Sequence, residues 1–154
     1  MERRISVTRR FGHWLIVCIA CLVAGAARSG ESVVLVTAET CPLQGISTLD
    51  IRKAYLGVVV RVEGHQVRPI LMRGDDRLEQ VFCQSVVAMS KKSYERRRLS
   101  LALKYGTPRL AEFHKVSDVS LALQSDECAI TYLWKRDAET IPGIKTIKLL
   151  WQDT

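Results

Sequence analysis

The sequence has little of what catalytic and metal-binding proteins need. It contains three histidines, and neither His65 nor His114 has a second metal-ligating side chain at a suitable spacing. No G-x-S-x-G, H-E-x-x-H or P-loop motif occurs, and there is no repeat or low-complexity segment. These absences argue against an enzyme, a metal site or a cofactor. They leave a binding or interaction protein as the expected class.

Residues 1–26 have the layout of a secretory signal peptide. Four arginines precede the apolar run Trp14–Val23, and small residues follow it. The run is short for a transmembrane helix. The sequence therefore predicts export to the periplasm through a cleaved signal, with a lipoprotein linked at Cys21 or an uncleaved anchor as alternatives. Residues 27–154 then form one domain, and loss of four arginines and one glutamate lowers the formal net charge from +7 to +4.

Cleavage would remove Cys18 and Cys21 and leave Cys41, Cys83 and Cys128. The only C-x-x-C pair leaves with the signal, so a redox motif is not expected in the mature chain. Three cysteines in an oxidising compartment allow one disulfide, in any of three pairings, and one spare thiol. Burial of all three as small apolar side chains explains the sequence equally well.

The hydrophobic pattern predicts strands alternating with helices. Strands are expected at Ser32–Thr37, Val67–Met72, Cys128–Trp134 and Lys145–Leu150. Helices are expected after a cap at Ser47 and ending at Gly57, from Asp76 to Met89, at Tyr94–Lys104 after a cap at Ser93, and at Val116–Gln124. Residues 58–62 fit a hairpin strand or an extended strap. The order predicts an α/β fold with a small mixed or parallel sheet flanked by helices.

The stretch Pro69–Phe82 is the centre of the expected site. It predicts a buried strand, a tight turn at Arg73-Gly74-Asp75 and a helix that begins at Asp76. Such a helix start offers unpaired N–H groups and a partial positive charge, which is where α/β proteins commonly hold an anion. Here the turn has two carboxylates. Asp76 is expected to cap the helix, while Asp75 and Arg73 contact a ligand, a partner or solvent.

Thr37 and Tyr132 end two of the expected strands, where this fold class binds ligands, and core packing is the alternative for both. The candidate ligand site comprises Thr37, Arg73, Gly74, Asp75, Asp76, Arg77 and Tyr132. A basic cluster at Lys91, Lys92 and Arg96–Arg98 would suggest nucleic acid in the cytoplasm. After export, a solvated helix face is expected, with acidic lipid or a partner surface as alternatives.

Four segments, in order, resemble the phosphate-type periplasmic substrate-binding proteins, which are periplasmic binding proteins of type 2. The segments are Ser47–Gly57, Val67–Phe82, Tyr105–Pro108 and Cys128–Tyr132. The resemblance covers roughly Val33–Leu150. It implies a short, single-unit member of a family whose two-lobed members close on phosphate and deliver it to an ABC transporter.

The resemblance also implies a difference at the site. Phosphate-binding members have a G-S-G-T turn whose hydroxyl and N–H groups hold the anion, whereas this chain has Asp75-Asp76-Arg77-Leu78. Carboxylates repel a phosphate at that distance, although Arg73 and Arg77 could hold a different anion. The expected function is an exported, non-enzymatic binding module for a small solute or a protein partner, with a lost or altered phosphate site. The alternative is a periplasmic signalling or assembly accessory that uses the surface of the fold.

Overall fold

The structure is a computed structural model that describes residues 30–153. Its strands are β1 (Ser32–Ala38), β2 (Val60–Val62), β3 (His65–Met72), β4 (Ala111–Phe113), β5 (Ala129–Trp134) and β6 (Ile144–Gln152). Its helices are α1 (Thr48–Tyr55), α2 (Asp76–Phe82), the π-helical turn η1 (Cys83–Val87), α3 (Lys91–Tyr105), α4 (Val116–Ser125) and α5 (Lys135–Ala138). The predicted signal peptide lies outside the described residues.

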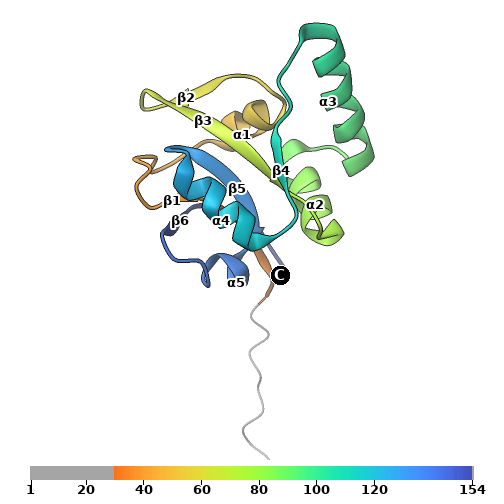
Figure 1. The fold of residues 1–154 in the computed structure, drawn as a ribbon. Helices are drawn as coiled ribbons and strands as arrows, with labels where there is room; N and C mark the ends of the chain where they lie inside the picture. Colours follow the sequence, from red (N-terminus) through yellow and green to blue (C-terminus); the bar gives the residue numbers. More distant parts are fainter. Residues whose placement is uncertain (1–29, 154) are drawn as a thin grey trace, which may run out of the picture.

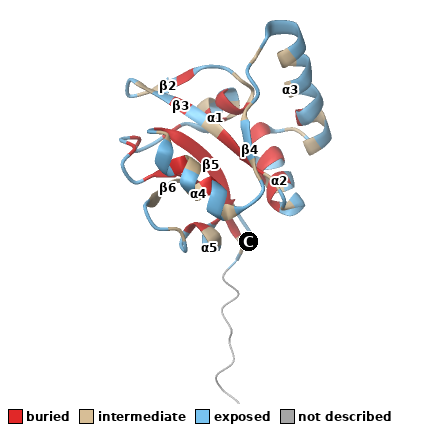
Figure 2. Cartoon of the chain, in the orientation of Figure 1, coloured by how far each residue is buried: buried red, intermediate tan, exposed pale blue. Residues whose placement is uncertain are grey.

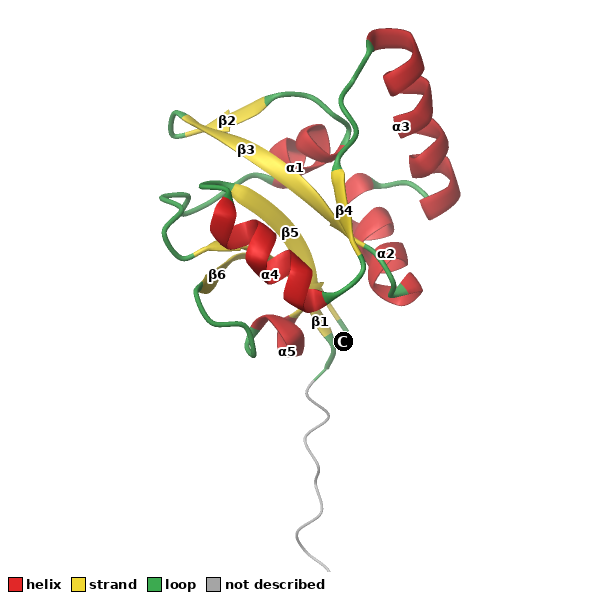
Figure 3. Cartoon of the chain, in the orientation of Figure 1, coloured by secondary structure: helices red, strands yellow, loops and turns green. Residues whose placement is uncertain are grey.

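The strands form one mixed sheet in the order β2-β3-β5-β1-β6, and β4 pairs with β3 (Figure 1). In the view of Figure 3, α4 crosses in front of β5, and α1 lies behind β3. β1 is antiparallel to both of its neighbours and buried along its whole length, as its continuous apolar run predicts. β3 is parallel to β5 and to β4. The expected α/β fold with a mixed sheet flanked by helices is confirmed.

The hairpin alternative for residues 58–62 is correct. β2 pairs antiparallel with β3 through a two-residue turn. Glu63 and Gly64 both have positive φ, 52° and 87°, which is the geometry that matches the right-handed twist of the flanking strands. An extended strap is excluded because Val60 lies directly opposite Val67.

α1 begins and ends as the sequence predicts. The Ser47 side chain accepts a hydrogen bond from the backbone N–H of Asp50 at 3.0 Å. Gly57 follows the helix with a φ of +85°, and a Cβ at that position would collide with the Thr107 side chain. Left-handed backbone and close packing both favour glycine there.

The helices after the central turn differ from the prediction. α2 passes into η1 instead of continuing to Met89, and the chain leaves η1 at Ala88, whose φ of 58° is left-handed. Ser90 then caps α3 by accepting from the N–H of Ser93 at 3.2 Å, so the prediction of Ser93 as the cap is wrong. The cap forms at the first serine after the left-handed residue, because the chain is already extended there.

Two short elements were not predicted. β4 has three residues and α5 has four, and segments this short leave no hydrophobic period to detect. β4 forms because the chain after α3 returns alongside β3 and pairs with it. Within residues 30–153, every helix is too short or too polar to span a bilayer.

Candidate functional site

The turn between β3 and α2 is shaped by a contact with the end of β4. The backbone N–H of Arg73 donates to the carbonyl of Phe113 at 2.7 Å. Gly74 follows with a φ of +95°, and a Cβ there would lie 3.2 Å from the carbonyl oxygen of His114. Both facts favour glycine. The turn therefore directs the start of α2 as the sequence predicts.

Asp75 caps α2, so the prediction of Asp76 as the cap is wrong. Asp75 has an extended backbone (φ −122°, ψ 100°), and its Oδ1 accepts from the N–H of Leu78 at 3.0 Å. Asp76 is already the first helical residue, and its side chain is 86% exposed and pairs with Lys91 at 2.7 Å. The cap lies one residue earlier because the turn is complete at Gly74. Asp75 therefore has the extended backbone of a capping residue, and the helix begins at Asp76.

The second carboxylate oxygen of Asp75 is also occupied. Its Oδ2 accepts from the indole N–H of Trp134 at 2.7 Å. Burial acts to raise the pKa of Asp75, but the hydrogen bonds from Leu78 and Trp134 outweigh it and hold the pKa below its ordinary value. A carboxylate of the protein itself therefore fills the start of α2, where the fold would otherwise offer N–H groups to an anion.

Arg73 is enclosed by carboxylates. Its guanidinium contacts Glu79 at 2.6 Å, Glu112 at 3.3 Å and Glu95 at 3.4 Å. Glu79 is almost fully buried and also pairs with Lys91 at 3.1 Å. Burial acts to lower the pKa of Arg73, and the bonds to Glu112 and Glu79 raise it above its ordinary value. Arg73 is thus committed to a structural ion-pair cluster rather than directed at a ligand.

Arg77 lies at the surface beside Trp134. Its guanidinium carbon is 5.6 Å from the centre of the Trp134 ring, and that of Arg136 is 5.8 Å from it. Both arginines pair with Glu31, at 2.5 and 3.3 Å. Their side chains are about two-thirds exposed, 60% and 66%. Of the cationic groups predicted for the site, Arg77 is the one that stays open to solvent.

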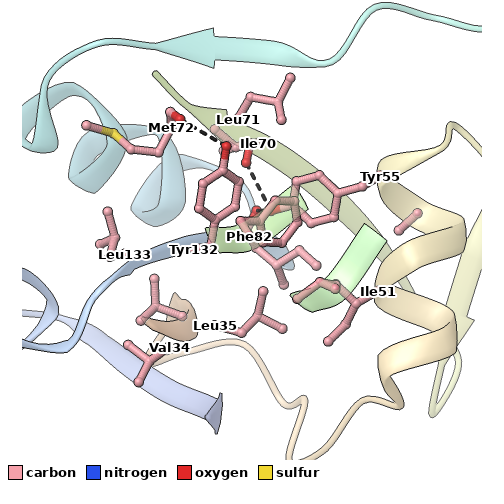
Figure 4. Packing of buried hydrophobic residues seen from close by; sticks show 14 of the residues in the cluster. Val34, Leu35, Ile51, Tyr55, Ile70, Leu71, Met72, Phe82, Tyr132 and Leu133 are labelled. Carbon is pink, nitrogen blue, oxygen red and sulfur yellow. Dashed lines mark hydrogen bonds between the residues drawn. The ribbon is translucent and has the colours of Figure 1, made fainter. Parts of the chain in front are cut away.

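Tyr132 and Thr37 are buried in the core. The Tyr132 ring stacks on Phe82, with ring centres 3.8 Å apart, and lies near Tyr55 (Figure 4). Its hydroxyl donates to the carbonyl of Met72 at 3.0 Å. Thr37 donates to the carbonyl of Ala129 at 2.7 Å. Both polar groups are satisfied inside the protein, which is the packing alternative considered for them from the sequence.

The sequence reasoning missed Trp134 and Glu79. Glu79 lies between Leu78 and Phe82 on the buried side of α2. An acid at that position needs a cationic partner, which could have indicated the Arg73 cluster. Trp134 ends a predicted buried strand, where an indole N–H needs an acceptor, but the sequence does not show which one.

Two hollows of the described surface lie beside α3 and β3. One of about 230 Å³ lies between α3 and residues 107–112, and four of its charged lining residues, Arg73, Glu95, Arg98 and Glu112, pair with one another. The other, of about 440 Å³, we call the β3 groove. Its apolar lining includes Val58, Val59, Val67, Pro69, Ile70, Leu110 and Phe113. Among the described residues, no three His, Cys, Asp or Glu side chains gather in a way that could hold a metal ion.

No protein-family model and no curated protein matches the sequence. Solved structures do match. A possible phosphate binding protein from Planctomyces limnophilus DSM 3776 aligns with a TM-score of 0.55 and 12% identity, over 82% of this chain and 46% of that chain. An ABC-type phosphate transport receptor from Vibrio cholerae aligns over 78% of this chain and 46% of that chain, with a TM-score of 0.49 and 10% identity.

The match to the Planctomyces limnophilus structure supports the fold and not the activity. The chain shares an α/β fold with that protein. It spans less than half the length of either matched structure. At 10–12% identity, residue roles do not transfer from them.

Proposed function

We propose that this chain is an exported, non-enzymatic binding module related in fold to phosphate-binding proteins, and that its phosphate site has been lost. The observation that supports the loss is the Asp75 carboxylate, held by Leu78 and Trp134 at the start of α2. Phosphate would have to lie beside this carboxylate or displace it. Charge repulsion opposes the first outcome, and loss of the cap and of the indole acceptor opposes the second.

Calorimetric titration of inorganic phosphate into the full chain at neutral pH tests the proposal. We expect no binding in the micromolar range, because Arg73 is already paired with Glu79 and Asp75 already accepts from the N–H of Leu78. A micromolar dissociation constant would contradict the proposal.

A pair of variants tests whether the carboxylate is the cause. Asp75→Ser removes the charge and keeps a hydroxyl that can cap the helix, and we expect it to gain measurable phosphate affinity. Asp76→Ser is the matched control, because it removes one acid from the same turn without touching the cap. Thermal unfolding first checks that both variants are folded. Equal phosphate affinities of the two variants would show that the Asp75 carboxylate does not exclude phosphate.

The second candidate function is a signalling or assembly accessory that binds a protein partner. The β3 groove favours it, because a mainly apolar lining suits an apolar segment of a protein better than a small anion. Val58 and Val59 at its margin are 54% and 69% exposed. Exposed apolar side chains gathered along one groove are typical of a protein interaction site.

Site-specific photocrosslinking in cells tests this second function. A crosslinker in place of Val59 should give one discrete adduct with a protein partner, since Val59 lines the β3 groove. A crosslinker in place of Arg61 is the matched control, because Arg61 is exposed on the neighbouring β2 strand and does not line the groove. The same adducts at both positions, or none at either, would count against a partner in this groove.

A further inference from the structure

Cys41 and Cys128 lie at the same end of two neighbouring strands. β1 and β5 are antiparallel, with Thr37 opposite Ile130. Cys41 follows the end of β1, and Cys128 directly precedes the start of β5. The register of the sheet therefore brings together two cysteines that are far apart in the sequence.

The backbone holds both cysteines in place. The N–H of Cys41 donates to the carbonyl of Ala38 at 3.1 Å, and the ammonium of Lys145 donates to the carbonyl of Cys41 at 2.5 Å. The carbonyl of Cys128 accepts from the N–H of Arg68 at 3.0 Å. The proximity of the two cysteines is thus fixed by strand pairing and loop bonds, not by one mobile side chain.

The two thiols are also close enough for Cys41 to act on the pKa of Cys128. Both cysteines are buried, at 0% and 3% exposure. Burial raises the pKa of Cys128 to about 12, and the neighbouring Cys41 side chain also acts to raise it. Cys83 lies elsewhere, at the start of η1, where the charged groups that act on it include Glu79 and Arg73. All three are free thiols in the structure.

We propose that Cys41 and Cys128 form a disulfide in the exported protein and that Cys83 remains a thiol. This goes beyond the binding function, and it selects one of the three pairings that the sequence allows. The reaction needs a disulfide oxidant. In exchange with oxidised glutathione, the two S–H bonds of the protein and the S–S bond of glutathione break. One protein S–S bond forms, and two reduced glutathione molecules leave with the two protons and two electrons.

The disulfide would connect the loop after β1 to the start of β5. It would close the long loop of chain from residue 41 to residue 128, and long loops gain most from a crosslink because the unfolded chain loses most freedom. We therefore expect oxidation to raise the midpoint of thermal unfolding by roughly 5–10 °C.

Peptide mapping tests the pairing. The full chain with Cys18→Ser and Cys21→Ser is reduced and unfolded, then refolded in a mixture of reduced and oxidised glutathione. Remaining thiols are alkylated, and the protein is digested without reduction. We expect the peptides of Cys41 and Cys128 to be joined and Cys83 to be alkylated. Alkylation of all three cysteines, or a link that includes Cys83, overturns the proposal.

Thermal unfolding with and without reductant gives a second measurement. Cys83→Ala in the same background should keep the difference in unfolding midpoint between oxidised and reduced protein, because Cys83 takes no part in the pairing. Cys41→Ala should abolish the difference, even though the substitution lowers stability by itself. A difference that persists in Cys41→Ala, or that disappears in Cys83→Ala, overturns the assignment.

Discussion

Two regions of the molecule differ in how their side chains are satisfied. Polar side chains at the turn between β3 and α2 have partners within the protein, whereas the outer surface leaves apolar side chains exposed. At the turn, Asp75 accepts hydrogen bonds from Leu78 and Trp134, and Arg73 forms ion pairs with three glutamates, at distances of 2.6–3.4 Å. On the outer surface, the β3 groove and α3 leave large apolar side chains in solvent. α3 stands away from the sheet (Figure 1), and Figure 2 shows that most of it is exposed.

The contrast separates a region that contributes to stability from a surface that leaves apolar side chains exposed. The start of α2 contributes to folding, because the Asp75 carboxylate caps the helix and accepts from the Trp134 indole. α3 contributes little to the core, since Tyr94 is its one buried residue. Four predictions test this division, from the largest expected effect to the smallest.

Arg73→Ala should lower the free energy of unfolding by about 3 kcal/mol, because it leaves Glu79 as a buried charge with only Lys91 as a cationic partner. Arg68→Ala is the matched control, since Arg68 forms an ion pair with Asp126 at 2.8 Å but its side chain is 60% exposed. The control should change stability by less than about 1 kcal/mol. Denaturant unfolding measures both, and similar losses would contradict the contrast.

Asp75→Ala should lower the free energy of unfolding by about 2 kcal/mol, because it removes the cap of α2 and leaves the indole N–H of Trp134 without its acceptor. Asp76→Ala should cost less than about 0.5 kcal/mol, since its side chain is exposed. Urea titrations compare the two variants. A larger loss of stability in Asp76→Ala would indicate that Asp76, and not Asp75, caps α2.

The sequence predicts the strongly patterned parts of this fold. The buried runs that became β1 and β5 and the Ser47 cap of α1 are each determined within a few residues. β4 and α5 could not be found in this way, because they form where tertiary packing returns the chain to the sheet.

The site was harder to predict than the fold, because its partners are distant in the sequence. The turn at residues 73–75 is a local feature and was predicted correctly. The choice between Asp75 and Asp76 as cap depends on the backbone of a single residue, and no pattern resolves that. The partners Trp134 and Glu112 reach the turn through the pairing of β5 and β4 with β3, which no local signal gives.

Stability should depend on pH through Asp75. The pKa of Asp75 is lower in the folded protein than its ordinary value near 3.9, so its contribution is complete above that value and is lost as the pH falls through the folded pKa. We expect the stability difference between wild type and Asp75→Asn to shrink by about 1 kcal/mol between neutral pH and pH 3. Urea unfolding at several pH values measures this. A difference that does not change with pH would show that the carboxylate has no stabilising charge.

The smallest effect is expected on the outer surface, at Leu103 of α3. Its side chain is 81% exposed, so Leu103→Gln removes almost no buried apolar area, and glutamine is a good helix former. The free energy of unfolding should stay within about 0.5 kcal/mol of wild type.

The matched change on the buried side of the same helix is Tyr94→Phe, which removes the hydroxyl that donates to the carbonyl of Tyr55 at 2.8 Å. That variant should lose about 1 kcal/mol, because a buried acceptor is left without its donor. Denaturant unfolding of the two variants decides whether α3 has one structural face and one exposed face. A loss in Leu103→Gln as large as that in Tyr94→Phe would mean that the outward face of α3 is covered in solution.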